Sequence, residues 1–288
     1  MIGRSRYFTL SPRYAILEAR LGYGKEMGMY HWNPEEYSRH SSEQAKWALE
    51  LIAKLNLRGT ERVLDIGCGD GKVTAELASS LPQGSVLGID SSPEMIAFAK
   101  DTFMDKFVNL AFQCVDVRQM SFAREFDMVF SNATLHWVAD HASVLTRIRQ
   151  SLRPSGKMLL QMAGKGNASD VVEVVNGMIR QEQWRAYFHD FSFPYTFFSD
   201  DEYKKLIKAA GLTVKRIELF PKTMLHKGQE GFSGWIRTTW HPYLQRLPAD
   251  LQERFVGELV ATYESRYPPD EEGFFRVGMV RLEVEAVR

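Results

Sequence analysis

Short apolar runs alternate with amphipathic stretches between residues 62 and 161, and this alternation limits the fold more than any other feature of the chain. The apolar runs predict buried strands at 62–66, 85–90, 110–115, 127–131 and 157–161. The stretches with helical spacing predict helices at 72–80, 93–103 and 142–152. Because strands and helices that alternate in this way form a parallel sheet covered on both faces, the sequence predicts an α/β fold with a doubly wound sheet.

After residue 165 the pattern changes to longer helical stretches, at 168–210 and 229–266. Two runs with strand-like alternation, 212–219 and 277–287, predict the last strands of a Rossmann-like, mostly parallel, seven-stranded sheet. The aromatic stretch 188–198 interrupts the first helical part. We therefore expect a helical cap that is inserted in the C-terminal half of the chain.

These patterns divide the chain into three parts. Residues 1–29 precede the first strong structural signal, and we expect them to form a loosely attached extension. Residues 30–165 are expected to hold N-terminal helices and the ligand-binding core; one helix has Trp47, Ala48 and Leu51 at helical spacing. Residues 166–288 are expected to hold the cap insertions and the last two strands of the same sheet.

Charge balance and cysteine content narrow the function classes. The chain has 36 Lys and Arg against 36 Asp and Glu, whereas a dedicated nucleic-acid binder normally carries a basic excess. Two cysteines make no disulfide framework, and no apolar run approaches the roughly 20 residues of a membrane helix. We expect a cytoplasmic protein with no nucleic-acid or membrane partner, and we leave open whether it is a monomer or a weak dimer.

Three glycines mark the turn between the first predicted strand and the helix that follows it. Gly67, Gly69 and Gly71 have no Cβ atom, so the backbone there can take a positive φ and approach a ligand closely. Ligands of open parallel sheets bind beyond the carboxyl ends of the strands, at such a turn. Cys68 is interpreted as a small residue that fits inside the turn.

Three carboxylates follow successive strands and indicate the kind of ligand. Asp65 lies two residues before Gly67, where it would repel the pyrophosphate of a dinucleotide but suits a cationic group. Asp90 lies 23 residues beyond Gly67, near the offset at which a carboxylate binds a ribose diol. Asp116 follows the third strand and can accept from an adenine amine. Together the three fit an adenosine with a positively charged tail, such as S-adenosylmethionine.

The same residues carry a family resemblance. The segments VLDIGCGDG, GIDSSPEMI, FDMVFSNATLHWVADH and LRPSGKMLL resemble the motif series of the class I S-adenosylmethionine-dependent methyltransferases. Within that superfamily, SNATLHW and residues 231–255 are similar to the trans-aconitate methyltransferases and, more distantly, to the insect juvenile hormone acid methyltransferases. The resemblance implies S-adenosylmethionine as cofactor. The residues predicted to bind the cofactor are Asp65, Gly67, Cys68, Gly69, Gly71, Asp90, Ser91, Met95, Asp116, Val117 and Asn132.

The acceptor side of the site is expected after the fourth strand, where His136 and Trp137 follow Asn132. Tyr37 and Gln44 have the spacing found in the hormone-acid methyltransferases. The resemblance implies that Gln44 and Trp137 hold the acceptor carboxylate. The chain departs from the family's common Leu-Gln-Trp motif, because it has His136 in place of the glutamine. His136 is therefore a third predicted catalytic residue, which could act as a general base near neutral pH.

Aromatic and basic residues of the cap are the candidates for binding the rest of the substrate. Trp235, Arg237 and Trp240 lie within about two helical turns, and Tyr195 lies in the aromatic stretch. Arg237 is the predicted partner of a polycarboxylic acid, and aromatic walls suit a long apolar acid. The seven histidines are scattered without metal-binding spacing, so no metal site is predicted.

The combined prediction is a methyltransferase that acts on a small molecule, by O-methylation of the carboxylate of an acid that resembles trans-aconitate. Three alternatives stay open. The first is N- or C-methylation with His136 as base. The second is methylation of an acid bound to an acyl carrier protein. The third is a scaffold that binds the cofactor without catalysis.

Overall fold

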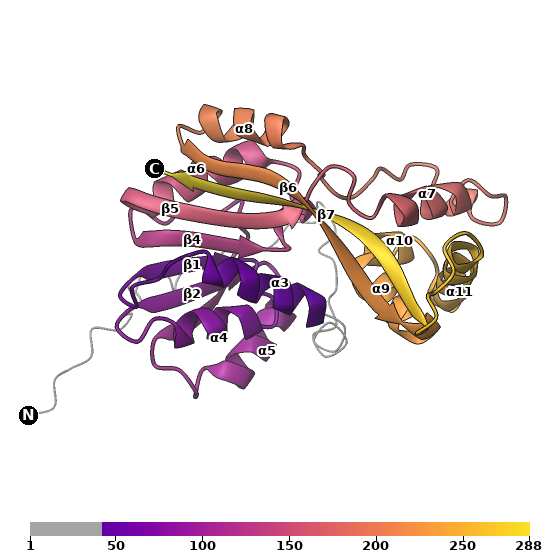
Figure 1. The fold of residues 1–288 in the computed structure, drawn as a ribbon, viewed down its shortest axis with the longest axis horizontal. Coiled ribbons are helices and arrows are strands. Elements are labelled where there is room, and N and C mark those ends of the chain that lie inside the picture. The colour runs from indigo at the N-terminus through magenta and orange to yellow at the C-terminus, as the bar shows by residue number, and fades with distance from the viewer. Residues whose placement is uncertain (1–41) are drawn as a thin grey trace, which may run out of the picture. The chain divides into compact units, whose positions relative to one another are not determined.

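A seven-stranded sheet forms the centre of the structure, a computed structural model that describes residues 42–288, with side chains from Lys46 onward (Figure 1). The strand order is β3-β2-β1-β4-β5-β7-β6. Strand β7 is antiparallel to both of its neighbours, and the other pairs are parallel. The strands are β1 (Arg62–Ile66), β2 (Ser85–Asp90), β3 (Leu110–Cys114), β4 (Phe126–Asn132), β5 (Leu152–Ala163), β6 (Thr213–Lys227) and β7 (Phe274–Val287). The predicted mostly parallel, seven-stranded sheet is confirmed.

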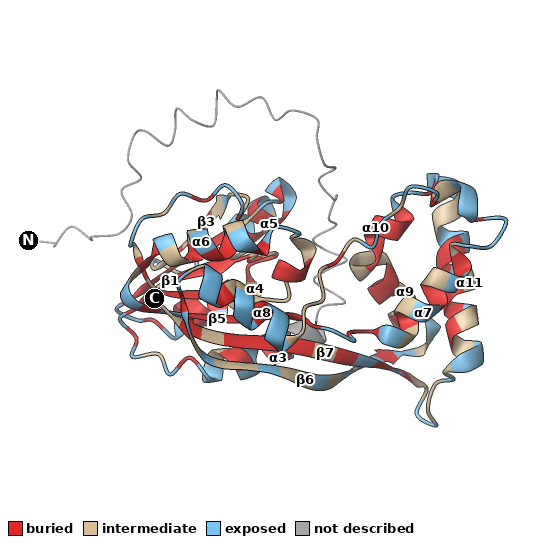
Figure 2. Cartoon of the chain, turned by 90° about the horizontal axis from the view of Figure 1, so that it is seen from above, coloured by how far each residue is buried: buried red, intermediate tan, exposed pale blue. Residues whose placement is uncertain are grey.

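Helices cover both faces of this sheet. Helices α3 (Ser42–Ala53), α4 (Lys72–Ser79) and α5 (Pro93–Phe103) share one apolar core with the sheet. Helices α6 (His141–Ser151) and α8 (Asp200–Ala209) share the core on the opposite face. Figure 2 shows the buried central strands between helices whose outer sides are exposed.

Local signals explain where several helices begin. Ser92 caps α5 by accepting a hydrogen bond from the Met95 backbone, and Pro93 stands at the first helical position, where its missing N–H costs nothing. In α8, Ser199 and Glu202 form a reciprocal capping box.

No described helix is both long enough and apolar enough to span a membrane.

The cap has an apolar core of its own. It consists of α7 (Ser169–Met178), η2 (Arg185–Tyr187), α9 (Gly228–Thr239), α10 (His241–Leu244), α11 (Ala249–Arg266) and the outer ends of β6 and β7. Its core is strongly aromatic, with Trp184, Phe232, Trp235, Tyr243 and Tyr263 all buried. Because aromatic side chains bury large areas, a few of them suffice to hold these short helices together.

Strands β6 and β7 are longer than predicted, since the sequence indicated strands only at 212–219 and 277–287. Their inner parts pair within the sheet, where Lys157–Ala163 of β5 lies against Val287–Arg281 of β7. Their outer parts, 221–227 and 274–280, pair with each other and with no other strand, and they continue into the cap. Strand β5 also begins earlier than predicted, at Leu152 rather than at residue 157. The long β6–β7 ribbon thus joins the sheet to the cap.

A buried carboxylate links α3 to this ribbon. Glu283 of β7 accepts hydrogen bonds from Lys54 Nζ at 2.8 and 2.9 Å, from Gln161 Nε2 at 3.3 Å and from Arg216. Burial raises the pKa of Glu283, but the hydrogen bonds and charges of Lys54 and Arg216 outweigh it, and its pKa lies below 4.5. Glu283 therefore stabilises the folded chain in its ionised form.

Replacing this carboxylate tests its contribution. Glu283→Gln is expected to lower the free energy of unfolding at pH 7 by about 2 kcal/mol, because it removes charge-assisted hydrogen bonds. A depressed folded-state pKa stabilises only above the unfolded pKa, so the difference from wild type should shrink as the pH falls below 4.5. Urea unfolding at pH 7 and at lower pH measures it. Glu285→Gln, on the same strand, is the control, and an equal difference at both pH values would contradict the assignment.

Candidate active site

The strand order places a crevice at the carboxyl ends of β1 and β4. From β1 the sheet continues through β2 and β3 on one side and through β4 and β5 on the other. Helical connections that leave adjacent parallel strands in opposite directions open a crevice between them. Across the crevice the two strands are tied by a hydrogen bond that Ser131 Oγ donates to Ile66 O, at 2.8 Å.

The glycine turn (residues 67–71) occupies this crevice. Gly67, Gly69 and Gly71 have φ values of 72°, 53° and 83°. A Cβ at Gly67 would lie 2.0 Å from Thr134 Cγ2, and one at Gly71 would lie 2.8 Å from Ala99 Cβ, so both positions are closed by packing. A Cβ at Gly69 would meet no atom within 4 Å. The turn therefore leaves open space at its central glycine, where a ligand can approach the backbone.

Asp90, the last residue of β2, holds the turn. Its Oδ2 accepts a hydrogen bond from Gly69 N at 3.0 Å, and its Oδ1 accepts one from Ser92 N at 2.9 Å. Burial raises the pKa of Asp90, and the backbone hydrogen bonds, which lower the pKa, only partly offset this rise. A carboxylate has about four acceptor sites, so Asp90 keeps capacity for the two hydroxyls of a ribose.

Asp65 lies beneath the turn and is fully buried. Thr74 Oγ1, from the first turn of α4, donates a hydrogen bond to Asp65 Oδ2 at 2.7 Å. Burial raises the pKa of Asp65 to about 7; the Thr74 hydrogen bond opposes the rise, and the charge of Asp90 adds to it. A cation would relieve the cost of two ionised carboxylates in one buried site, so the residues present fit the positive end of S-adenosylmethionine.

The other predicted cofactor residues lie at the same edge of the sheet. Ser91 follows Asp90, Met95 is buried in the first turn of α5, and Asn132 ends β4. Asp116 and Val117 come just after β3. Arg118 Nε donates to both oxygens of Asp116 at 3.0 Å, and Arg118 outweighs burial and lowers the pKa of Asp116. The structure thus brings the predicted cofactor residues to one edge; their individual roles stay predictions.

Next to the glycine turn, a cavity opens between the ends of β4 and β5 and the cap. We call it the cap cavity; it is lined by Ala133, His136, Trp137, Ala163, Asn167, Tyr195, Phe197, Met224, Trp235, Thr238, Thr239, Trp240, Met279 and Arg281. Thr134 connects it to the turn: its Oγ1 donates to Gly67 O at 3.1 Å, and its neighbour Ala133 lines the cavity. The cap cavity is thus one residue away from the glycine turn.

His136 and Trp137 lie in the short 3-10 helix η1 (Leu135–Trp137) that follows β4. The Trp137 ring stacks on His241, with ring centres 5.0 Å apart, and meets Tyr195 edge-on at 4.9 Å. His136 is buried, and burial, together with the charges of Arg281 and His141, puts its pKa well below 6.5. His136 is therefore uncharged at neutral pH.

The predicted substrate residues are only partly brought together. Trp235, Trp240 and Tyr195 line the cap cavity. Arg237 does not; it forms an ion pair with Glu253 of α11 at 2.7 Å. Tyr37 lies outside the described residues, and so does the side chain of Gln44, although its backbone belongs to α3.

Sequence reasoning missed Thr74, Thr134 and Arg281. Arg281 is the most consequential, because its buried side chain lines the cap cavity. It occupies a polar position of the alternating segment 277–287, and such positions face solvent in a half-buried strand. Here that face is covered by α3, and the Arg281 guanidinium lies over the Trp47 ring, 5.7 Å from its centre.

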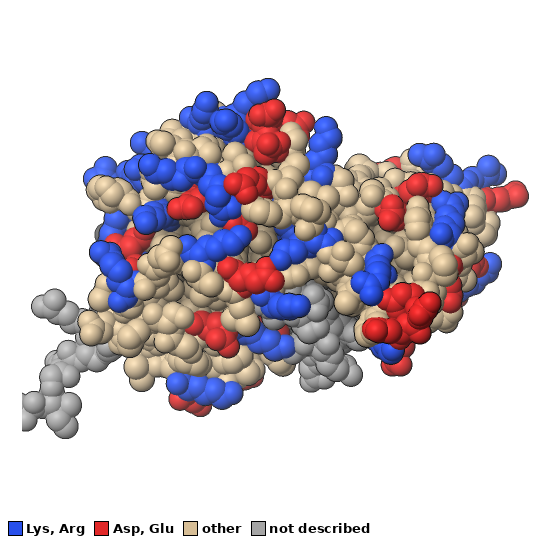
Figure 3. Space-filling view, in the orientation of Figure 1, with Lys and Arg blue, Asp and Glu red and all other residues tan. Residues whose placement is uncertain are grey.

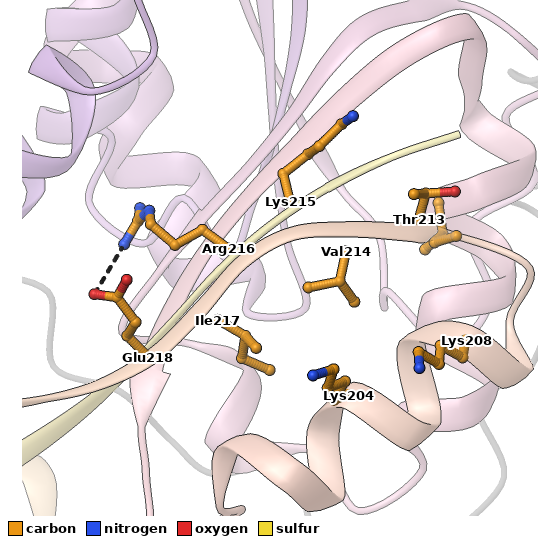
Figure 4. Close-up of a pocket in the computed structure, with 9 residues that line it drawn as sticks. Lys204, Lys208, Thr213, Val214, Lys215, Arg216, Ile217 and Glu218 are labelled. Carbon is orange, nitrogen blue, oxygen red and sulfur yellow. Dashed lines mark ion pairs between the residues drawn. The ribbon is translucent and has the colours of Figure 1, made fainter.

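A second, open pocket of about 580 Å³ lies between α8 and β6 (Figure 4). Lys204, Lys208 and Lys215 line it, with Arg216 paired to Glu218 at 3.8 Å. The part of β6 that lines the pocket begins at Thr213, which pairs with Val287 of β7. Val287 also pairs with Lys157, at the amino end of the part of β5 that pairs with β7. The pocket therefore lies toward the edge of the sheet opposite the glycine turn.

The face seen in Figure 3 has no large patch of one charge, because basic and acidic side chains are mixed over both the core and the cap. Among the side chains that the structure describes, from Lys46 onward, no three of His, Cys, Asp or Glu gather as a metal ion would need.

Comparisons with known proteins agree with this geometry. The sequence family described as a methyltransferase domain matches residues 63–156. A trans-aconitate 2-methyltransferase of Methylobacterium nodulans is 30% identical over 268 residues, which cover 90% of this chain and 99% of that protein. A trans-aconitate 2-methyltransferase of Escherichia coli is 30% identical over 264 residues, with the same coverage of both chains.

Solved structures share the fold. A crystal structure of a Bacillus halodurans protein superposes with a TM-score of 0.58 at 17% identity, covering 83% of this chain and 97% of that one. A Haemonchus contortus phosphoethanolamine N-methyltransferase in complex with S-adenosyl-L-methionine has a TM-score of 0.55 at 19% identity, covering 88% of this chain and 56% of that one. At these identities the likeness concerns the fold alone.

The open space at Gly69 can be tested by filling it. Gly69→Ala is expected to weaken S-adenosylhomocysteine binding about tenfold or more, because the methyl group enters the ligand's space. Gly228→Ala is the matched control, since Gly228 has a φ of 60° and its Cβ would also meet no atom within 4 Å. Both should lose about 1 kcal/mol of stability from the left-handed backbone. Calorimetric titration gives the affinities; equal affinities in the two variants would contradict the assignment.

The raised pKa of Asp65 predicts pH-dependent binding. Only the ionised carboxylate attracts the cofactor's ammonium group, so S-adenosylhomocysteine affinity should fall as the pH drops below about 7. The loss reaches at most about tenfold per pH unit. Asp65→Asn should bind weakly and show no such dependence between pH 8 and 6, whereas Asp101→Asn, exposed on α5, should keep the wild-type profile. An unchanged profile in Asp65→Asn would refute the assignment.

Proposed function

The chain belongs to the family of the trans-aconitate 2-methyltransferases, which are S-adenosylmethionine-dependent enzymes, and on that premise we propose that it methylates a carboxylate oxygen of a small acid. The observation that carries the proposal is the adjacency of two sites: the glycine turn with its buried carboxylates, and the cap cavity that begins at Ala133. A methyl donor and its acceptor need this adjacency, since the transfer is direct.

The chain's own residues would hold and orient the reactants. Asp65 would bind the cofactor's ammonium group, Asp90 its ribose hydroxyls, and Asp116 its adenine amine. The cofactor, when bound, supplies a methyl group that is already activated. The protein therefore contributes alignment and the exclusion of water, which the buried aromatic rings around Trp137 provide.

The state of His136 favours a carboxylate over a nitrogen or carbon acceptor. A carboxylate is ionised at neutral pH and needs no base, whereas a protonated amine or a carbon acid must first lose a proton, which a group that is basic near pH 7 assists. Burial and the nearby charge of Arg281 make His136 a weak base. His136 would thus replace the family's glutamine as an uncharged hydrogen-bonding group.

Gln44 and Trp137 are the proposed carboxylate clamp. Trp137 lines the cap cavity, and Gln44 is assigned by resemblance. Uncharged donors can orient a carboxylate nucleophile without neutralising it, whereas an adjacent guanidinium would draw off the charge that attacks the methyl carbon.

The remaining alternatives draw less support from the geometry. A basic docking face near the cap would favour an acid bound to an acyl carrier protein. The basic pocket of Figure 4 lies instead toward the edge of the sheet opposite the glycine turn. A scaffold without turnover would not need a second cavity beside the cofactor residues.

The proposal is tested by product chemistry. The protein is incubated with labelled S-adenosylmethionine and a series of small carboxylic acids, and the product is then treated with alkali. A methyl ester releases its label as methanol, whereas N-methyl and C-methyl products keep it. Label that stays with the product, or no product from any acid in a protein that binds S-adenosylhomocysteine, would refute carboxylate methylation.

The same assay tests the clamp. Gln44→Ala and Trp137→Phe are each expected to lower kcat/KM about fivefold or more, since each loses one hydrogen bond to the substrate. Affinity for S-adenosylhomocysteine should stay at the wild-type value. Tyr267→Phe, at the end of α11 and outside the cap cavity, is the control. If both clamp variants keep wild-type kcat/KM, the clamp is wrong.

A further inference from the structure

Three ring nitrogens around the cap cavity are buried without a hydrogen-bond partner. They are His136 Nδ1, Trp235 Nε1 and Trp240 Nε1, and their residues come from η1 and from α9 with its C-terminal cap. An indole nitrogen can only donate a hydrogen bond, and a buried donor without an acceptor costs about 1–3 kcal/mol. Such groups are rare in folded proteins, so the two indole N–H groups in the wall of one cavity indicate a missing acceptor, and His136 adds a further donor in the tautomer that is protonated at Nδ1.

A positive charge lies in the same wall. Arg281 is only 3% exposed, and its strand register places it beside Ala163 at the carboxyl end of β5. Its guanidinium packs over the Trp47 ring, and its charge is felt at His136, whose pKa it helps to lower. None of the described residues that line the cavity is acidic. The described wall therefore favours a negatively charged ligand.

A carboxylate group matches this wall in charge and hydrogen bonding. Its two oxygens accept about four hydrogen bonds, and a guanidinium can donate two of them in parallel.

The carboxylate that this wall binds is not the one that reacts. A bidentate guanidinium withdraws charge from its partner, and this would weaken the oxygen that must attack the methyl carbon. We propose that the cap cavity binds a second, non-reacting carboxylate of the substrate through Arg281, with Trp235 and Trp240 as uncharged donors. The inference rests on the proposed carboxylate methylation and assigns to Arg281 the selection of polycarboxylic acids over monocarboxylic acids.

The structure also shows how Arg281 is oriented. Two cations contact the ring of Trp47 of α3, with Arg281 at 5.7 Å and Lys222 at 5.8 Å from its centre. Lys222 in turn pairs with Glu50, one turn further along α3. Helix α3 therefore braces the face of β7 that carries Arg281. Trp47 is a positioning residue in this arrangement.

The test compares trans-aconitate, with three carboxylates, against crotonate, with one. Arg281→Met keeps an apolar chain of similar length on Trp47 but removes the charge. We expect the ratio of the two kcat/KM values, trans-aconitate over crotonate, to fall about 100-fold. Trp240→Phe, which loses the indole N–H, should lower the ratio about fivefold. Arg276→Met, an exposed arginine of β7 paired with Asp270, is the control and should leave the ratio unchanged.

Binding separates this inference from the proposed function. Trans-aconitate is titrated into the complex with S-adenosylhomocysteine, where no transfer can occur. If trans-aconitate binds more weakly to Arg281→Met than to wild type, while S-adenosylhomocysteine affinity and Tm are preserved, the result supports carboxylate binding by Arg281. This holds even if no ester forms in the assay. The inference is overturned if wild type binds trans-aconitate no more tightly than crotonate, or if Arg281→Met leaves the ratio of kcat/KM values at its wild-type level.

Discussion

The hydrogen bond from Gly69 N to the Asp90 carboxylate is the interaction on which the rest of the site depends. It joins the turn after β1 to the end of β2 and fixes the central glycine with open space in front of it. Gly67 and Gly71 allow this geometry because they have no Cβ, and neighbouring side chains leave no room for one at either position. Asp65, held by Thr74 below, adds a second buried carboxylate. The result is a negatively charged, pre-organised crevice that fits a cationic adenosine derivative.

The β6–β7 ribbon determines where the acceptor side lies. Because β7 is antiparallel to β5, it carries Arg281 to the carboxyl end of β5. Further along, the ribbon leaves the sheet and supports the helices of the cap, so that Trp235 and Trp240 come to lie around the same cavity as Arg281. One pair of strands thus joins the sheet to the cap and supplies the buried cation between them.

The two halves of the site have opposite electrostatic character. Around the glycine turn, Asp65 and Asp90 are buried acids whose pKa values are raised. Around the cap cavity, a buried guanidinium and uncharged ring donors face the ligand space, and His136 is kept neutral. A cationic methyl donor and an anionic acceptor would each meet complementary charge, with Trp137 in the wall of the acceptor side. In the proposed function, this division of charge would align the two reactants without a catalytic base.

Local sequence determined the α/β sheet, the glycine turn and the carboxylates at the strand ends, because strand periodicity, glycine φ and N-terminal caps act over a few residues. It also indicated the methyltransferase family, through motifs that lie along one edge of the sheet. It could not show the length of β6 and β7, since their outer parts are ordered by pairing with each other beyond the sheet. Nor could it distinguish Arg237, paired with Glu253 on the cap, from Arg281, buried in the cavity. Both are arginines in regular patterns, and only the packing of α3 against β7 decides which of the two lines the cap cavity.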